Sequence, residues 1–208
     1  MISLFLDTSS SYLNIGIFKN GTLLSSLYKR FDRDLSKEAL FEIKNLLDSS
    51  SISVHDLDEI ICVKGPGSFT GLRVGVTIAK TMSYFLGIKL YSTSSLDVMA
   101  TSCNSRIIVP LIDARRGYVY ASIYDKNYNV LMDECYIKLD ALIKKVDSYS
   151  LDYVYVSNDS FSFDSTLFKP FLENFYKYGK KTLEDPMLFV PNYLKRPEAE
   201  EKLCDNKC

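Results

Sequence analysis

Short apolar runs separated by polar turns open the chain. The runs cover residues 2–7, 12–18 and 22–28, and a Ser-rich turn and an Asn20-Gly21 turn separate them. Short or alternating apolar runs joined by such turns are typical of antiparallel strands. The pattern therefore predicts three antiparallel strands at the N-terminus.

A helical period follows. Residues 34–47 repeat apolar side chains at a spacing of three and four, which predicts an amphipathic helix packed on a neighbouring element. These side chains are Leu35, Ala39, Leu40, Ile43, Leu46 and Leu47. Beyond them, the pattern predicts a buried strand at 59–63, a long helix at 68–86, a strand at 88–91 and a short helix at 94–100.

The opening pattern returns about one hundred residues later. Residues 106–113, 118–124 and 130–136 again read as three strands, and an offset of 106 aligns Asp113 with Asp7 and Tyr124 with Phe18. A period this long indicates two copies of one lobe, because the repeats of solenoids are far shorter. A helix at 139–146, a strand at 153–156 and a helical, aromatic-rich tail complete the second copy. Chance likeness of two hairpins is the alternative. We therefore predict two stacked α/β lobes, residues 1–102 and a smaller lobe with a tail at 103–208.

Composition removes several classes of function. The chain has 208 residues, 25 basic against 26 acidic side chains and a formal net charge of −1. Residues 1–105 carry 10 basic and 10 acidic side chains, and residues 106–208 carry 15 and 16. Neither half is a basic arm, so charge gives the chain no reason to bind a polyanion by itself.

Histidine and cysteine are too few, or too scattered, for most metal sites. His55 is the single histidine, so a His-paired zinc protease site cannot form. It lies in a polar stretch, and we expect it in an exposed loop or at a helix start. The five cysteines are scattered; Cys204 and Cys208 are a close pair without two further ligands nearby.

Nothing in the pattern indicates a membrane protein. No signal peptide precedes the first strand, and no apolar run approaches the ~20 residues that span a bilayer. The expected compartment is a reducing cytoplasm.

The segment from Val63 to Gly75 is the most informative motif. A strand runs into Gly65-Pro66-Gly67, and the hydroxyl of Ser68 is placed to cap the following helix. A helix start of this kind presents free backbone N–H groups that can hold an anion. It is not a Walker A loop, which requires Gly-Lys-Ser/Thr, and a tight strand-to-helix turn explains the motif equally well.

The helix at 68–86 has two apolar stripes. One contains Phe69, Leu72, Val76, Ala79 and Leu86, and the other contains Gly71, Gly75, Ile78, Met82 and Phe85. So wide an apolar surface has to be buried over most of its circumference. Either the helix at 34–47 covers the second stripe, or another protein chain does.

A hydroxyl-rich turn follows the first strand. Asp7, Thr8 and Ser9, together with Gly65, Gly67 and Ser68, are candidates for contact with a nucleotide or another anion. Asp113 takes the equivalent place in the second lobe, followed by Arg115 and Arg116. Ordinary turn chemistry accounts for Thr8 to Ser11 about as well.

Four motifs together resemble the TsaB (YeaZ) family. They are a strand ending in Asp7-Thr8-Ser9, the run from Gly65 to Gly75, the run from Ile112 to Tyr120, and the run from Pro191 to Lys195. The resemblance covers nearly the whole chain in order. It implies a two-lobed actin/Hsp70/sugar-kinase-like (ribonuclease H-like) fold. It also implies a non-catalytic, dimerising subunit that works with a larger paralogue, TsaD, and an ATPase, TsaE. Together they place a threonylcarbamoyl group on the adenosine next to the anticodon in tRNA.

The resemblance also implies where partners bind. In the family, first-lobe helices form a bundle with a second copy or with the paralogue, and an adenine nucleotide lies near that junction. We therefore expect no cofactor bound firmly by this chain alone, and ATP or ADP at the partner junction. On this basis the expected contacts are Phe69, Gly71, Leu72, Arg73, Gly75 and Lys80. The paralogue's His-xxx-His metal pair has no counterpart at 34–47, and no metal site is expected.

Two other classes of function compete with this interpretation. An independent actin-like ATPase or kinase would use Asp7, Asp113 and the Gly65–Gly67 turn. A peptidase, suggested by an old family label, ranks last because the chain has one histidine.

Overall fold

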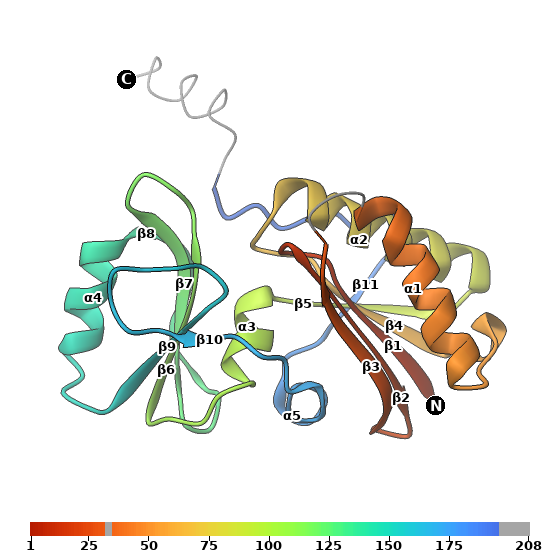
Figure 1. Ribbon diagram of the computed structural model, residues 1–208, viewed down its shortest axis with the longest axis horizontal. Coiled ribbons are helices and arrows are strands. Elements are labelled where there is room, and N and C mark those ends of the chain that lie inside the picture. Colours follow the sequence, from red (N-terminus) through yellow and green to blue (C-terminus); the bar gives the residue numbers. More distant parts are fainter. Residues whose placement is uncertain (32–34, 196–208) are drawn as a thin grey trace, which may run out of the picture.

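Two mixed β-sheets form the body of the protein. The computed structural model describes residues 1–31 and 35–195, and within them the strands fall into one six-stranded and one five-stranded sheet. Figure 1 shows the two sheets side by side, with helices on their outer faces and between them.

The first sheet begins with three antiparallel strands, as predicted. They are β1 (Ile2–Asp7), β2 (Tyr12–Lys19) and β3 (Thr22–Arg30), and β4 (Glu59–Val63) and β5 (Lys89–Thr93) join parallel to β1. The sixth strand, β11 (Thr182–Glu184), pairs antiparallel with β5, so the sheet order is β11-β5-β4-β1-β2-β3. The sequence pattern did not predict β11.

The second sheet repeats this beginning. The strands β6 (Ile107–Asp113), β7 (Tyr118–Asp125) and β8 (Val130–Lys138) are antiparallel, and β9 (Tyr153–Ser157) and β10 (Thr166–Leu167) extend the sheet in parallel. The predicted fold class is therefore confirmed. The division at residues 102 and 103 stays a prediction, and the chain returns to the first sheet at β11.

Two helices cover the outer face of the first sheet. They are α1 (Leu35–Ser49) and α2 (Phe69–Leu86), and Ser68 caps α2 by accepting a hydrogen bond from the Gly71 N–H at 3.3 Å. Their apolar sides bury a core with the strand residues Leu4, Leu13, Ile15 and Ile60. The helix α4 (Leu139–Asp147) covers the second sheet in the same way.

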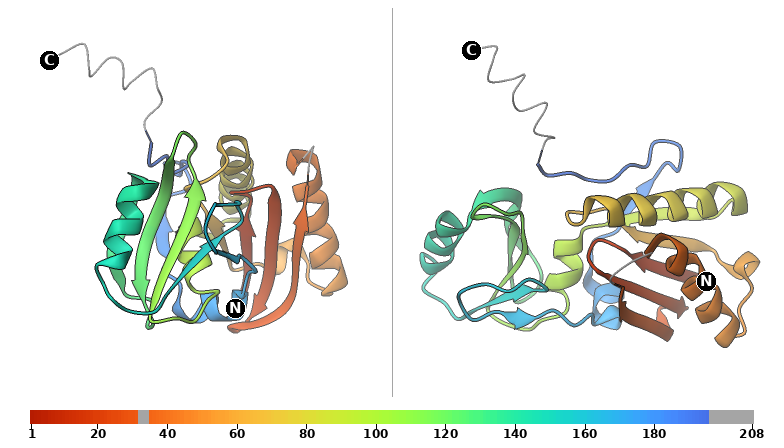
Figure 2. Two further views of the ribbon diagram at one scale, coloured as in Figure 1. Left: turned by 60° about the vertical axis from the view of Figure 1, so that its left-hand side comes forward. Right: turned by 45° about the horizontal axis from the view of Figure 1, so that its top comes forward.

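A second core joins the lobes. The helices α3 (Ser95–Ala100) and α5 (Leu172–Tyr178) lie between the sheets and bury Phe5, Phe18 and Ile61 of the first sheet with Tyr124 and Val156 of the second. The turned views show the same arrangement (Figure 2). The lobes are thus joined by packed side chains as well as by the connecting chain.

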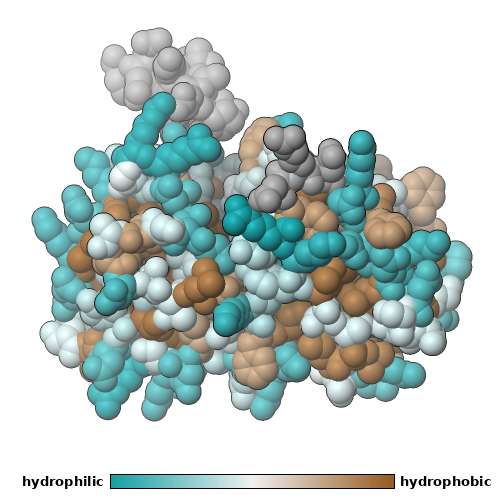
Figure 3. Space-filling model, in the orientation of Figure 1, coloured by the Kyte–Doolittle hydropathy of each residue, from teal (hydrophilic) through white to brown (hydrophobic). Residues whose placement is uncertain are grey.

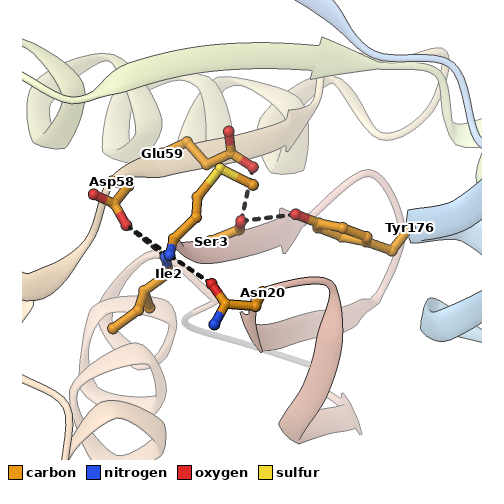
Figure 4. A network of polar contacts seen from close by, with 7 residues as sticks. Ile2, Ser3, Asn20, Asp58, Glu59 and Tyr176 are labelled. Carbon is orange, nitrogen blue, oxygen red and sulfur yellow. Dashed lines mark hydrogen bonds and ion pairs between the residues drawn. The ribbon is translucent and has the colours of Figure 1, made fainter.

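Polar contacts hold the start of β1 in place. The terminal amine donates to Asn20 Oδ1 at 2.8 Å, and the Ile2 N–H donates to Asp58 Oδ2 at 2.6 Å. Ser3 Oγ donates to Glu59 Oε1 at 2.7 Å and lies 3.2 Å from the Tyr176 hydroxyl (Figure 4). Ser3 therefore connects the first sheet to α5.

His55 and the described cysteines play structural parts. His55 is exposed in η1 (Val54–Asp56), as expected. Cys62 is buried, and Cys103 and Cys135 are half-buried free thiols; Cys204 and Cys208 lie outside the described residues. None of the helices in residues 1–31 and 35–195 combines the length and hydropathy of a membrane-spanning segment.

Candidate functional site

A cleft of about 530 Å³ lies between the lobes. The turn after β1, the start of α2 and the turn after β6 meet there. Four of the predicted contact residues line it, namely Asp7, Ser9, Gly67 and Ser68, and so do Asp113 and Arg115. Asp7 and Asp113, which the sequence repeat aligns with each other, therefore line the same cleft.

Asp7 is one of the residues that line this cleft. It is almost fully buried, and its Oδ1 accepts the Ser9 N–H at 2.8 Å. Burial raises the pKa of the Asp7 carboxyl, and the hydrogen bonds from Ser9 oppose that shift without cancelling it. The Ser9 carbonyl accepts the Ser68 N–H at 2.7 Å, which fixes the turn against the start of α2.

The second lobe contributes a turn with an unusual backbone. Arg115 and Arg116 have φ of +67° and +55°, in the left-handed region that non-glycine residues seldom adopt. Asp113 Oδ1 holds the turn by accepting the Arg115 N–H at 2.8 Å, and Asp159 Oδ2 accepts the Asp113 N–H at 2.8 Å. Burial also raises the pKa of Asp159.

The cleft offers donors for an anion and carboxylates for a cation. The α2 start, Ser9 and Ser68 supply N–H and hydroxyl groups, Arg115 supplies a positive charge, and Asp7 and Asp113 supply oxygen ligands. Within residues 1–31 and 35–195, however, no three His, Cys, Asp or Glu side chains gather into a metal site. The arrangement is suited to binding, and the histidine lies elsewhere.

The other two predicted contacts lie outside this cleft. Thr8 is fully buried, and its hydroxyl donates to the Gly71 carbonyl at 2.7 Å. Gly65 lines a separate cavity of about 240 Å³, together with Lys64, Asp97 and Glu134. Neither of them reaches the space between Asp7 and Asp113.

The six predicted partner contacts on α2 divide into two groups. Leu72 is buried, and Gly71 and Gly75 pack on Thr8 of the same chain. A Cβ at Gly71 would lie 2.0 Å from the Thr8 carbonyl oxygen. These three positions present no surface to a partner, and we revise the predicted contact set accordingly: the glycines serve internal packing.

The remaining three contact the C-terminal segment. Phe69 stacks on Tyr193 with ring centroids 5.1 Å apart, and the Arg73 guanidinium lies 3.9 Å from the centre of the Phe69 ring. Arg73 Nε donates to the Tyr193 hydroxyl at 3.1 Å, and Lys80 Nζ donates to the Met187 carbonyl at 2.8 Å. Figure 2 shows this blue segment running along α2.

Sequence reasoning missed this covering of α2. The run from Pro191 to Lys195 was identified only as part of a resemblance. No periodicity in it indicates that the Asn192 N–H donates to the Lys64 carbonyl at 2.7 Å and so fixes Tyr193 over Arg73.

The outer sides of α1 and α2 carry large exposed side chains, two of which the sequence pattern placed in apolar stripes. Leu40 and Phe41 of α1 and Tyr84 and Phe85 of α2 are 54–79% exposed. Leu40 was counted in the buried stripe of its helix, and Phe85 in the second stripe of α2. Brown side chains interrupt the hydrophilic surface of this lobe in Figure 3.

Comparisons with known proteins agree with this fold. A family model described as tRNA N6-adenosine threonylcarbamoyltransferase (TsaD) matches residues 29–201. The tRNA threonylcarbamoyladenosine biosynthesis protein TsaB of Bacillus subtilis is 36% identical over 135 residues, which are 63% of this chain and 58% of that protein. The Escherichia coli protein of the same name is 27% identical over 130 residues, 61% of this chain and 56% of its own length.

A solved structure supports the fold over almost the full length. YeaZ from Pseudomonas aeruginosa has a TM-score of 0.76 at 20% identity, and the match covers 93% of this chain and 99% of that one. The matched region spans less than two thirds of the Bacillus subtilis and Escherichia coli relatives. By the family model and these relatives together, the chain belongs to the TsaD family and, within it, to the TsaB (YeaZ) proteins.

Proposed function

We propose that this chain is a non-catalytic subunit that binds and activates a TsaD-type paralogue. The paralogue would transfer a threonylcarbamoyl group to the adenosine next to the anticodon in tRNA. The observation that carries the proposal is the set of large exposed side chains on α1 and α2, namely Leu40, Phe41, Tyr84 and Phe85, in a chain of this family.

This surface has the character of a docking site. The two helices pack against each other on one face of the first sheet, so their outer sides lie on the same part of the molecule. Large exposed apolar side chains that gather on a folded protein mark interaction sites. A helical surface of the paralogue, or of a second copy of this chain, would bury them, and we propose that these two partners compete for it.

The balanced charge of the chain bears on how the assembly would bind tRNA. Because the net charge is −1 and both halves are balanced, tRNA would bind the complete assembly, which includes a TsaE-type ATPase. The proposed place of action is the cytoplasm. ATP or ADP would bind in the cleft between the lobes or at the partner junction, with Ser9, Ser68 and Arg115 as contacts.

The test is a reconstituted modification assay with TsaD-type and TsaE-type proteins and tRNA. Omitting this chain should abolish modification, and Phe41→Glu should weaken both the complex and the activity. Leu131→Glu is the matched control, because Leu131 is an exposed apolar residue of β8 in the other lobe. Unchanged modification without the chain would refute the proposal.

The cleft itself favours a second candidate, an independent actin-like ATPase or kinase. Asp7 and Asp113 face one cleft, as such chemistry requires. Steady ATP turnover by the purified chain, lost in Asp7→Ala, would place this candidate above the first.

A further inference from the structure

A third cavity, of about 440 Å³, opens beside α5. Strands β2 and β3 form one side, and residues 167–173 form the other. Its rim is exposed at Ser26, Lys169 and Glu173, and its floor is buried at Asn14, Phe168 and Leu172. A volume of this size suits a small organic molecule.

Asn14 is the unusual residue of this cavity. Its side chain is 1% exposed, and neither its amide nitrogen nor its amide oxygen has a hydrogen-bond partner within the described part of the chain. A buried polar group without a partner is costly, and native proteins seldom leave one. An amide that lines a cavity with both of its polar atoms unpaired indicates a ligand with a complementary donor and acceptor.

Three aromatic rings line the same cavity as the amide. Tyr28 is the register partner of Asn14 on β3, and it stacks on Tyr12 with ring centroids 4.6 Å apart and planes 9° from parallel. Phe168 meets Tyr28 edge-on at 6.1 Å. The Tyr28 hydroxyl donates to Asn158 Oδ1 at 3.2 Å, which fixes the ring. The cavity therefore combines flat apolar walls with one amide.

We propose that this cavity binds an adenine-type heterocycle, read by the amide of Asn14. The amide can donate to N7 of adenine and accept from its N6 amino group, a pairing that satisfies both atoms at once. Guanine presents two acceptors, O6 and N7, at the same edge and would leave the amide oxygen unpaired. The aromatic walls suit the flat faces of the base.

This site differs from the one proposed for a nucleotide in the cleft between the lobes, although the two are neighbours. Asn14 pairs in register with Asp7 on β1, and Phe168 lines both spaces, but Asp7 lines only the cleft and Asn14 only the cavity beside α5. The inference goes beyond the proposed function and stands without it, since a chain that binds no paralogue would still have this cavity.

Calorimetric titration with nucleosides tests the proposal without involving phosphate. The wild-type chain should bind adenosine saturably and bind guanosine and N6,N6-dimethyladenosine at least about fivefold more weakly, because each lacks the N6 donor. Absence of saturable adenosine binding, or equal binding of all three, overturns the proposal. This comparison needs no variant.

Asn14→Leu supplies the second arm. The substitution replaces an unpaired amide with an apolar side chain of similar size, so the variant should unfold at a temperature no lower than the wild type and lose adenosine binding. Arg115→Ala is the control, since Arg115 lines the other cleft, and adenosine binding should persist in it. If Asn14→Leu still binds adenosine as tightly as the wild type, the amide does not read the base.

Discussion

Thr8 and Gly75 lie so close that only a glycine fits on the helix side: a Cβ at residue 75 would be 2.3 Å from Thr8 Oγ1. The same threonine contacts Gly71 one turn earlier, so α2 approaches the turn after β1 through its two glycines. The start of α2 and the turn are thereby held together, and both line the cleft between the lobes.

Gly75→Leu should therefore destabilise the chain itself. Overpacking a tight contact costs about 1–3 kcal/mol, and the side chain that residue 75 would meet, Thr8, is fully buried in the turn after β1. Urea unfolding should show the midpoint decrease, with Thr81→Leu on the exposed side of the same helix as the control. A stable monomer that merely fails to associate would show instead that Gly75 faces a partner.

Thr8→Val tests the polar half of the same contact. The valine keeps the shape of the side chain but leaves the Gly71 carbonyl without the threonine hydroxyl, at a cost of about 1 kcal/mol. Thr8→Ser keeps the hydroxyl and should lie nearer to the wild type. Equal stability of the wild type and the valine variant in urea would show that the hydrogen bond contributes nothing measurable.

Tyr193→Ala should release the C-terminal segment from α2. The substitution removes the stacking on Phe69 and the acceptor of Arg73, and because an aromatic pair contributes only about 0.5–1.5 kcal/mol, global stability should change little. Hydrogen exchange should increase in residues 185–195 and remain unchanged in β4. Tyr193→Phe keeps the ring and should show a smaller increase; no increase in either variant would contradict the assigned contact.

Local chemistry explains what the sequence predicted correctly. The Asn20-Gly21 turn and the Ser68 cap depend on neighbouring residues, and each copy of the repeat that aligns Asp113 with Asp7 is built from strands joined by short turns; all are found in the structure. Four of the six candidate contact residues line one cleft, since strand ends and helix starts meet at one edge of a sheet, and their contact with a nucleotide stays a prediction.

Long-range contacts explain what the sequence pattern did not predict. The glycines at 71 and 75 allow close approach of any neighbour. Their spacing in the sequence therefore does not show whether that neighbour is Thr8 of the same chain or a residue of a second chain. The strand β11 is three residues long, and only its pairing with Leu90 to Ser92 of β5 makes it a strand. The cavity beside α5 combines Asn14 with Phe168, and no local pattern connects the two.

The stability of the chain should depend on pH through Asp97, a buried residue of α3. Burial raises the pKa of this carboxyl from 3.8 to about 6, although its Oδ2 accepts the Lys180 N–H at 2.6 Å and the Lys180 charge also opposes the shift. The folded chain then keeps the proton in a pH range where the unfolded chain has released it. Stability from this group is therefore greatest below about pH 4, falls as pH rises to about 6, and stays level above that.

Asp97→Asn removes this dependence, because the amide cannot ionise and its oxygen can still accept the Lys180 N–H. The difference between the pKa values of 3.8 and about 6 corresponds to a free energy of about 3 kcal/mol at most. Between pH 4 and pH 7 the free energy of unfolding of the variant should therefore rise by up to that much relative to the wild type. Urea unfolding of both chains at a series of pH values measures the difference, and Asp133→Asn, an exposed residue of β8, is the control. A constant difference across the series would show that the folded chain does not hold the Asp97 proton.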